Sequence, residues 1–435
     1  MRNVHSLFAV LIGSTCVVAA CSDDAGTPAA SGTAGASGAS GAGGTGGTGG
    51  TAGTGGGGSG GSDSMPDASG NVDGTTPEGA TGDDASSPFK PTLLVDLGDA
   101  CNTPDGMRKD PKSNDIILSC PNFFGKTGDA GAFSAPPVLM KITPANKLEM
   151  YFADLPAPAG APNRAGPMGI DFGPDGNLYV ADHQYRYDTM YKSRILRVNV
   201  DMAGKPTTAD VVVEGIRLSN ALMWNKDYLY LSDTWAYDDP PTGGKSAIYR
   251  FTKAELAAAN TANTIKIQKP TATTADPHMF AQFTTVPDRG VNLAGADGIT
   301  FDAAGNLYTG NFGDGVITKI TFDAMGNKAT QTEFVKDPML TCADGIFFDA
   351  MSSNIYVTDS QKNAIRVISP AGVVSTLWEN EDSNGEGGLL DQPAEPAIRG
   401  NELLIANFDA GFSATQPGKN KTADAPHTIS VIKLK

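Results

Sequence analysis

The stretch DGITFDAAGNLYTGNFGDGVITKITF, residues 297–322, contains the pattern that decides the fold. It holds three short apolar runs, and the first two are separated by a turn-forming segment with glycine and asparagine. Short apolar runs bounded by such residues are typical of β-strands joined by tight turns. The stretch therefore predicts a β-hairpin followed by a third strand.

The same pattern recurs on both sides of this stretch. Clear copies begin at Met168, Asn220 and Asp344, and weaker copies begin at Asp105 and Glu395. Successive copies start 47 to 77 residues apart, which is typical of propeller blades with loop insertions. A fourth strand pattern follows in five of the copies. We therefore predict an all-β fold, a six-bladed β-propeller with four antiparallel strands per blade.

The sixth copy reaches the end of the chain at Lys435 before a fourth strand can form. The segment PTLLVDLG, Pro91–Gly98, precedes the first copy and has the pattern of an outer strand. Pairing this segment with blade six closes the ring and covers a sheet edge that would otherwise promote aggregation. We expect residues 91–435 to form the propeller, closed by this N-terminal strand.

Residues 1–21 have one basic residue and an apolar run too short to span a bilayer, as in an export signal. The stretch Val18-Ala19-Ala20-Cys21 looks like a bacterial lipobox, which predicts lipidation of Cys21 and, with Ser22 next, sorting to the outer membrane. An ordinary signal with an incidental cysteine is the alternative. Residues 22–90 hold 22 of the 53 glycines and almost no large apolar residues, which predicts a disordered linker.

The predicted propeller carries a net charge of −10, out of −16 for the whole chain. It has no basic stripe that would neutralise phosphates, so we expect no nucleic-acid partner. An acidic surface suits a cation or an uncharged ligand better. We predict a cell-envelope lipoprotein, on the periplasmic face or the cell surface, that is monomeric and contacts the membrane only through its lipid. Its partner would be a small-molecule substrate or a glycan or protein ligand.

Three cysteines remain beyond the leader, in a compartment that favours disulfides. Cys101 precedes blade one, and Cys120 ends the second strand of that blade, so both are expected on the same face of a propeller. We predict a disulfide between Cys101 and Cys120. Three buried free thiols, Cys342 included, are the alternative.

The first residue of each repeat stands where the inner strand of a blade enters the central channel. Five of the six can offer a side-chain oxygen to one point on the axis: Asp105, Asn220, Asp297, Asp344 and Glu395. Carboxylates in such a ring repel one another unless a cation binds or an acid keeps its proton. Ligands that are all oxygen favour Ca²⁺ over Mg²⁺ or Mn²⁺ and argue against zinc. Alternatively, each carboxylate only caps its own turn.

Two blades give the sequence a resemblance to the SMP-30/gluconolactonase family of six-bladed, metal-dependent lactonases, and more loosely to NHL-type propellers. Ser219–Trp235, SNALMWNKDYLYLSDTW, looks like the family's Asn-Gly-Leu blade. Gly295–Ile320 looks like its Pro-Asp-Gly blade. The resemblance implies that Asn220 and Asp297 are metal ligands.

The family's ligating glutamate leaves two interpretations open. If the blade order is rotated, the resemblance places this glutamate at Glu395, which Pro396 follows. Without rotation, the metal ligands are Asp105, Asn220, Asp297 and Asp344. In both cases Asp297 or Asp344 is the candidate general base.

One departure concerns substrate binding. The family's Arg-x-Asn-Asp-Gly segment would fall at Ala165–Gly169, which reads AGPMG and lacks both the arginine and the asparagine. Arg164, with Asn163 before it, lies just upstream and is a candidate substitute. His183 follows the second strand of blade two and is a candidate base at the same mouth, although a lone loop histidine is more often solvated.

Aromatic residues follow second strands in five blades, where they can line a pocket or only pack the loops. They are Phe123, Tyr185, Trp235, Phe312 and Phe408. The predicted substrate contacts are therefore Arg164, His183, Tyr185 and Trp235.

Two functions remain open at this point. The first is a calcium-dependent hydrolase of a lactone or related small ester. The second is a propeller without enzymatic activity that binds a glycan, a peptide or a partner protein. The sequence contains no G-x-S-x-G, H-E-x-x-H, C-x-x-C-H or Walker motif, which argues against serine hydrolases, zincins, c-type cytochromes and NTPases.

Overall fold

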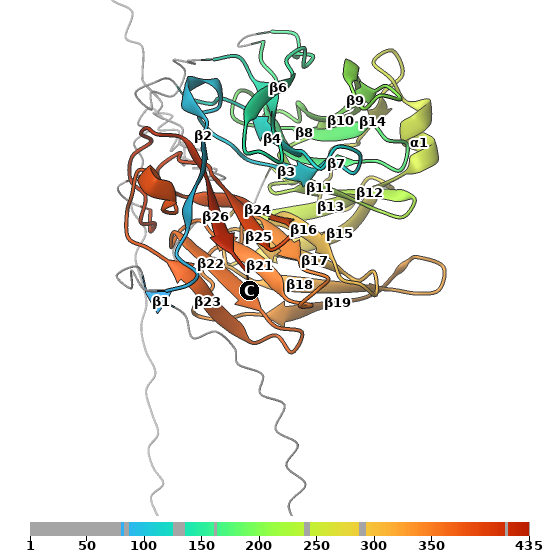
Figure 1. Cartoon of the computed structure of the whole chain (residues 1–435). Coiled ribbons are helices and arrows are strands. Elements are labelled where there is room, and N and C mark those ends of the chain that lie inside the picture. The colour runs from blue at the N-terminus through green and yellow to red at the C-terminus, as the bar shows by residue number, and fades with distance from the viewer. Residues whose placement is uncertain are drawn as a thin grey trace, which may run out of the picture. The chain divides into compact units, whose positions relative to one another are not determined.

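The computed structural model describes residues 80–81, 87–124, 135–160, 163–238, 244–286, 293–413 and 416–434. These residues form six β-sheets, each with a core of four antiparallel strands. Figure 1 shows the sheets in chain order, from blue to red. The predicted six-bladed β-propeller is confirmed.

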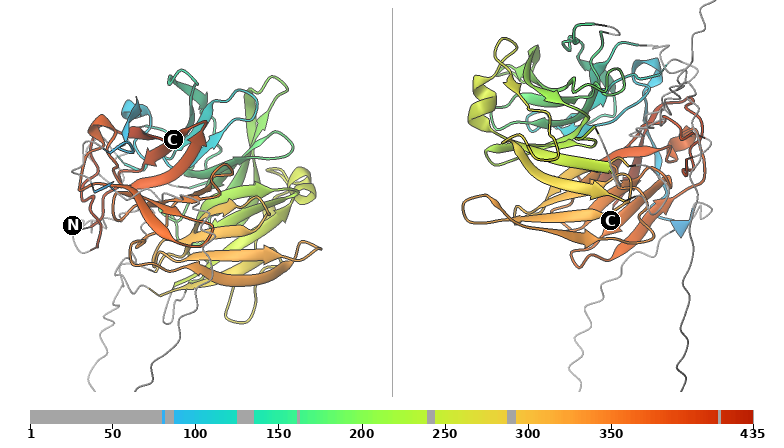
Figure 2. Two further views of the ribbon diagram at one scale, coloured as in Figure 1. Left: turned by 60° about the horizontal axis from the view of Figure 1, so that its bottom comes forward. Right: turned by 180° about the vertical axis from the view of Figure 1, so that it is seen from behind.

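Each blade starts with its inner strand, and in blades one to five the other strands follow outward in chain order (Figure 2). Blade one comprises β3 (Met107–Lys109), β4 (Ile116–Cys120), β5 (Val138–Ile142) and β6 (Leu148–Phe152). Blade two comprises β7 (Pro167–Phe172), β8 (Leu178–Asp182), β9 (Ser193–Val200) and β10 (Pro206–Ile216). Blade three comprises β11 (Ser219–Asn225), β12 (Tyr228–Asp233), β13 (Gly244–Thr252) and β15 (Met279–Thr285).

The remaining blades follow the same plan. Blade four comprises β16 (Ala296–Phe301), β17 (Leu307–Asn311), β18 (Ile317–Phe322) and β19 (Lys328–Val335). Blade five comprises β20 (Ile346–Phe348), β21 (Ile355–Asp359), β22 (Ala364–Ile368) and β23 (Val374–Glu379). Blade six comprises β24 (Pro393–Arg399), β25 (Glu402–Asn407), β26 (Thr428–Lys433) and, from the other end of the propeller sequence, β2 (Thr92–Asp96).

The inner strands close a ring around the axis. They contact one another in the order β3, β7, β11, β16, β20 and β24, and β24 contacts β3 again. The outer position of blade six is filled by β2, which pairs antiparallel with β26 from Thr92 opposite Val431 to Asp96 opposite Thr428. The Leu97 N–H extends this pairing by donating to the carbonyl of His427 at 2.8 Å. Closure by the N-terminal strand is therefore confirmed.

Short elements outside this plan lie at blade edges and in loops. β1 (Ala80–Thr81) pairs in parallel with β23, so part of the segment predicted as linker adds to blade five. β14 (Ile265–Lys266) pairs in parallel with β10. The only α-helix in the described part of the chain, α1 (Lys253–Ala258), is held by a capping box between Thr252 and Glu255. The 3₁₀ turns η1 (Gly98–Ala100) and η2 (Glu386–Gly388) flank blades one and six.

The predicted leader and most of the predicted linker, with Cys21, lie outside the described residues. Among the residues that are described, no helix has the length and apolar character needed to cross a bilayer.

The turn of the opening repeat shows why this sequence folds locally as it does. Between β16 and β17, the Asp302 carboxylate accepts the N–H groups of Ala304 and Asn306 at 3.0 and 2.8 Å. Gly305 has φ +83°, a left-handed conformation that glycine adopts without a steric penalty. The pattern D-x-x-G-N therefore stabilises the turn between the two strands.

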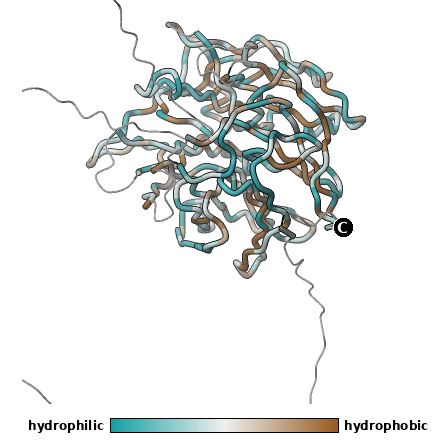
Figure 3. Tube along the Cα trace, turned by 90° about the vertical axis from the view of Figure 1, so that its left-hand side faces the viewer, coloured by the Kyte–Doolittle hydropathy of each residue, from teal (hydrophilic) through white to brown (hydrophobic). Residues whose placement is uncertain are grey.

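The core lies between neighbouring blades. The second strands β4 and β8 are buried along their whole length. Ile117 and Leu139 of blade one, for example, pack in one cluster with Ile170 and Leu178 of blade two. Figure 3 shows hydrophobic stretches alternating with hydrophilic ones along the chain, as expected where buried strands alternate with turns.

Candidate functional site

The structure brings the five predicted oxygen-bearing residues of the ring to one small cavity on the propeller axis. We call this set the axial ring: Asp105, Asn220, Asp297, Asp344 and Glu395. The sixth repeat start, Met168, is buried in an apolar cluster with Phe123 and Phe408. The cavity leaves only about 10 Å³ for the centre of a water-sized sphere, which is room for about one water or one ion.

Glycines next to the ring residues let the inner strands approach this closely. A Cβ on Gly106 would lie 2.5 Å from the carbonyl oxygen of Met168, and a Cβ on Gly298 would lie 2.4 Å from that of Asp344. Gly345 is equally constrained, at 2.3 Å from the carbonyl oxygen of Ala394. The repeated Asp-Gly pair therefore serves packing around the axis, in addition to any turn chemistry.

The carboxyl groups of the axial ring are buried and poorly compensated. Asp105, Asp297 and Asp344 are 6%, 2% and 5% exposed, and Glu395 is half-buried. Asp297 Oδ2 is buried without a hydrogen-bond partner, so this carboxylate does not simply cap its own turn. Asp344 Oδ2 accepts from Ser360 Oγ at 2.6 Å. The nearest cation, Arg108, lies at the cavity wall but is paired with Asp171, Nε to Oδ1 at 3.1 Å.

Burial and mutual repulsion raise the pKa values in this ring. Desolvation, with the charges of Asp344 and Glu395, raises the pKa of Asp105 well above its usual range. The same causes, with Asp344 as the strongest neighbour, raise the pKa of Asp297 well above its usual range. Desolvation raises the pKa of Glu395 to about 8. The ring is therefore a site where a proton or a cation must compensate the negative charge.

The metal-free protein should lose stability as the pH rises from about 5 to about 8. The folded state keeps the Glu395 proton up to its pKa of about 8, whereas the unfolded chain releases it near 4.5. Unfolding therefore releases a proton in this interval, and the Glu395 contribution to stability falls with rising pH by at most about 5 kcal/mol. Asp105 and Asp297 add to the slope, because their pKa values are raised as well. Thermal unfolding in EDTA should show the slope, and Glu395→Gln should reduce it. An unchanged slope in the variant would contradict the assignment to Glu395.

The donor atoms around this cavity are of the kind that a hard divalent cation prefers. Four carboxyl groups and the Asn220 amide offer oxygens around a cavity of single-ion size, with no histidine or cysteine in its lining. Ca²⁺ takes six to eight oxygens in irregular geometries, whereas Mg²⁺ requires a near-ideal octahedron. Both candidate ligand sets, with and without rotated blade order, lie on the same cavity.

His183 is buried, so the expectation of a solvated loop histidine is wrong. It is 1% exposed, its ring lies 5.8 Å from that of Phe123, and its Nδ1 lies 3.4 Å from the carbonyl oxygen of Ser219. Nε2 is buried without a hydrogen-bond partner. Desolvation lowers the pKa of His183 to about 4, so the imidazole is neutral at physiological pH.

Arg164 binds backbone instead of projecting freely into the mouth. One guanidinium nitrogen donates to the carbonyl oxygens of Ala135 at 2.7 Å and Asn122 at 3.2 Å. It thereby ties the entrance of blade two to the loop of blade one.

The predicted loop aromatics are buried and pack in apolar clusters. Tyr185, Trp235 and Phe312 are at most 8% exposed and share one apolar cluster with Phe412. Arg217 lies over the rings of Tyr185 and Trp235, at 5.3 and 6.0 Å from their centroids. Of the two predicted roles for these aromatics, packing is the one observed.

Cys101 and Cys120 are joined in a disulfide with a Cα–Cα distance of 5.1 Å, whereas Cys342 is a buried free thiol. Three aspartates that were not among the predicted site residues, Asp391, Asp409 and Asp424, bring their carboxylates together in the loops of blade six. These aspartates fall outside the repeat pattern. The only signal in the sequence is that each lies close to the end of a predicted strand of the same blade.

Solved structures with the same architecture are known. The chain is similar to a luciferin-regenerating enzyme, with 15% identity and a TM-score of 0.50 over 79% of this chain and 97% of that one. It is also similar to a gluconolactonase from Xanthomonas campestris, with 12% identity and a TM-score of 0.45 over 83% and 99%. A third is the calcium-binding protein regucalcin from Agrobacterium tumefaciens, with 14% identity and a TM-score of 0.47 over 80% and 96%.

No protein-family model matches the sequence, and no curated protein matches it either. The structural likeness, at these identities, concerns the fold alone. The chain is a six-bladed β-propeller, similar in fold to the luciferin-regenerating enzyme.

Proposed function

We propose that the axial ring binds one divalent cation, Ca²⁺ by preference, and that the protein uses it to hydrolyse a small lactone or related ester. The observation that carries the proposal is the unpartnered, buried Oδ2 of Asp297 among three further carboxyl groups on a cavity of single-ion size.

The ligands would be Asn220 and Asp297, together with Glu395 in the rotated order or with Asp105 and Asp344 in the unrotated order. A bound cation would polarise the substrate carbonyl and stabilise the negative charge that develops on its oxygen. Asp297 or Asp344 would accept a proton from the attacking water. The Ser360 hydroxyl fixes the orientation of the Asp344 carboxylate.

Calorimetry and a lactone panel test this proposal together. We expect the purified protein to bind Ca²⁺ at the axial ring and to hydrolyse at least one small lactone, with activity lost in EDTA and restored by Ca²⁺. Absence of Ca²⁺ binding to the axial ring at millimolar concentrations would overturn both the metal site and the hydrolase.

A second candidate function is favoured by the buried aromatics. Tyr185, Trp235 and Phe312, two of which were predicted to contact substrate, are instead buried together in one apolar cluster. In this case the cation is structural, and the propeller binds a glycan, a peptide or a partner protein on its surface. Ca²⁺ binding without hydrolysis of any lactone in the panel would favour this function over the first.

We also propose that the protein is a cell-envelope lipoprotein held in the outer membrane through Cys21. Cys21→Ser should leave the protein without acyl chains and soluble in the periplasm, because the lipid is its only membrane contact. Fractionation with metabolic labelling by a fatty acid would measure both effects. Continued partition of the variant with membranes would show that another part of the chain binds them.

A further inference from the structure

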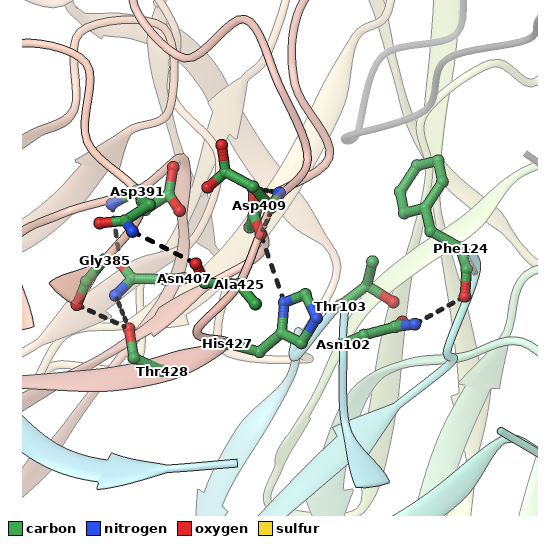
Figure 4. Close-up of polar contacts among 12 residues, drawn as sticks. Asn102, Thr103, Phe124, Gly385, Asp391, Asn407, Asp409, Ala425, His427 and Thr428 are labelled. Atoms are coloured by element: carbon green, nitrogen blue, oxygen red, sulfur yellow. Dashed lines mark hydrogen bonds and ion pairs between the residues drawn. The ribbon is translucent and has the colours of Figure 1, made fainter. Parts of the chain in front are cut away.

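A second group of carboxylates lies in blade six, separate from the axial ring. Asp391 precedes β24, Asp409 follows β25, and Asp424 precedes β26. One carboxylate oxygen of each lies within 4.8 Å of those of the other two. Oxygens bound to one Ca²⁺ at about 2.4 Å lie at most about 4.8 Å apart, so all three can reach a single ion. Figure 4 shows Asp391 and Asp409 on adjoining loops, with His427 beside Asp409.

Hydrogen bonds satisfy only some of the carboxylate oxygens in this cluster. Asp391 and Asp409 are each 1% exposed. Asp391 Oδ1 accepts from Asn420 Nδ2 at 2.5 Å, but Asp391 Oδ2 is buried without a hydrogen-bond partner. Asp424 Oδ1 is likewise buried without one, while its Oδ2 accepts from Thr422 Oγ1 at 2.7 Å. Two free acceptor oxygens therefore belong to this one cluster.

The surroundings supply little positive charge. His427 Nδ1 lies 3.3 Å from Asp409 Oδ2, but burial lowers the pKa of His427, which favours the neutral imidazole. The Asp424 N–H donates to Asp409, and Asn420 is shared between Asp391 and Asp409. Desolvation and the neighbouring aspartates raise the pKa values of Asp391 and Asp409 well above their usual range. An uncompensated buried charge of this kind is costly to folding.

We propose that Asp391, Asp409 and Asp424 form a second Ca²⁺ site, which fastens the loops of blade six. The donors are hard oxygens, and they come from irregular loops, which suits the flexible coordination of Ca²⁺ better than the strict octahedron of Mg²⁺. This site is independent of the hydrolase proposed above.

The position of the site links it to ring closure. The carbonyl of His427 accepts the N–H of Leu97, at the end of β2. Thr428, the first residue of β26, contacts Asn407 through its hydroxyl and pairs with Asp96 of β2. An ion that holds together the loops next to β24, β25 and β26 therefore also stabilises β26, the strand that pairs with β2.

The test counts bound Ca²⁺ in the full-length protein and in variants. We expect two equivalents by calorimetry, one of which is lost in Asp391→Asn and in Asp409→Asn, while Asp297→Ala loses the other. Affinity at the blade-six site should fall at least about a hundredfold in each aspartate variant. Asp382→Asn, which changes an acid close to Asp424, is the matched control and should keep both equivalents.

Hydrogen exchange gives a second readout. Ca²⁺ should slow exchange in β2 and β26 of the Asp297→Ala protein but not of the Asp297→Ala/Asp391→Asn protein. Without metal, the variants should have thermal midpoints no lower than that of the parent protein, because each substitution removes a buried repulsive charge. A lower midpoint would therefore identify a misfolded variant. If Asp391→Asn misfolds, Asp424→Asn at the half-buried ligand provides the same test. Unchanged Ca²⁺ stoichiometry and exchange protection in folded variants, or preferential Mg²⁺ binding at equal concentrations, would overturn the proposal.

Discussion

Replacing Asp297 by alanine is expected to remove the Ca²⁺ equivalent of the axial ring and to abolish lactone hydrolysis. Both candidate ligand sets contain Asp297, and its Oδ2 has no hydrogen bond that would compensate the charge. The substitution therefore removes a ligand and a candidate base together, and activity should fall by at least about 10²–10³-fold. The metal-free fold should persist, because the ring loses a buried charge that its neighbours repel.

Calorimetry and initial rates on the lactone panel measure both effects. The matched control is Glu333→Ala, which changes an exposed acid on β19 of the same blade. If Asp297→Ala bound Ca²⁺ and hydrolysed lactone like the control, the axial ring would not be the active site.

Two further substitutions separate the two ligand sets. In the rotated order, Glu395→Ala should lose the axial Ca²⁺, while Asp344→Ala should weaken it only modestly through loss of a nearby charge. Without rotation the pattern reverses. Equal effects of both substitutions would show that all the carboxylates share the ion.

Deleting residues 1–98 is expected to give an aggregating protein, whereas deleting residues 1–90 should leave a folded monomer. The longer deletion removes β2 and with it the antiparallel pairing to β26. The freed edge of β26 then presents unpaired N–H and C=O groups that can recruit another chain. The shorter deletion removes β1, a two-residue parallel addition at the edge of blade five, and should cost little.

Size-exclusion chromatography and thermal unfolding compare the two truncated proteins. The longer deletion should lower the thermal midpoint by about 10 °C or more, since the loss of several kcal/mol shifts a domain of this size by a few degrees per kcal/mol. Equal midpoints and equal elution volumes would show that β2 is dispensable for closure.

The architecture was predictable because its determinants are local and repeated. Each blade is encoded by apolar runs and by turns such as Asp302–Asn306, whose glycine takes a left-handed conformation whatever lies around it. The number of repeats also predicted the number of blades. Because the last repeat lacks a fourth strand, Pro91–Gly98 was predicted to supply it. The positions of Cys101 and Cys120 followed from the same blade plan.

The convergence of the axial ring was predictable for the same reason, since equivalent positions of a closed repeat must meet at the axis. The repulsion among its carboxylates was predictable too, but the extent of their burial was not. The raised pKa values of Asp105 and Glu395 depend on how far the strands exclude water, which follows from distances between blades and not from the residues of any one blade.

Only the tertiary structure decided which loop residues are buried and which carboxylates meet. His183 and Trp235 follow their strands as loop residues do, yet packing between loops of different blades buries both. Asp391, Asp409 and Asp424 come together because the strands of blade six start and end on one face, while the chain between them takes irregular paths. Contacts of this kind depend on the folded positions of residues distant in sequence, and no periodic pattern along the chain records them.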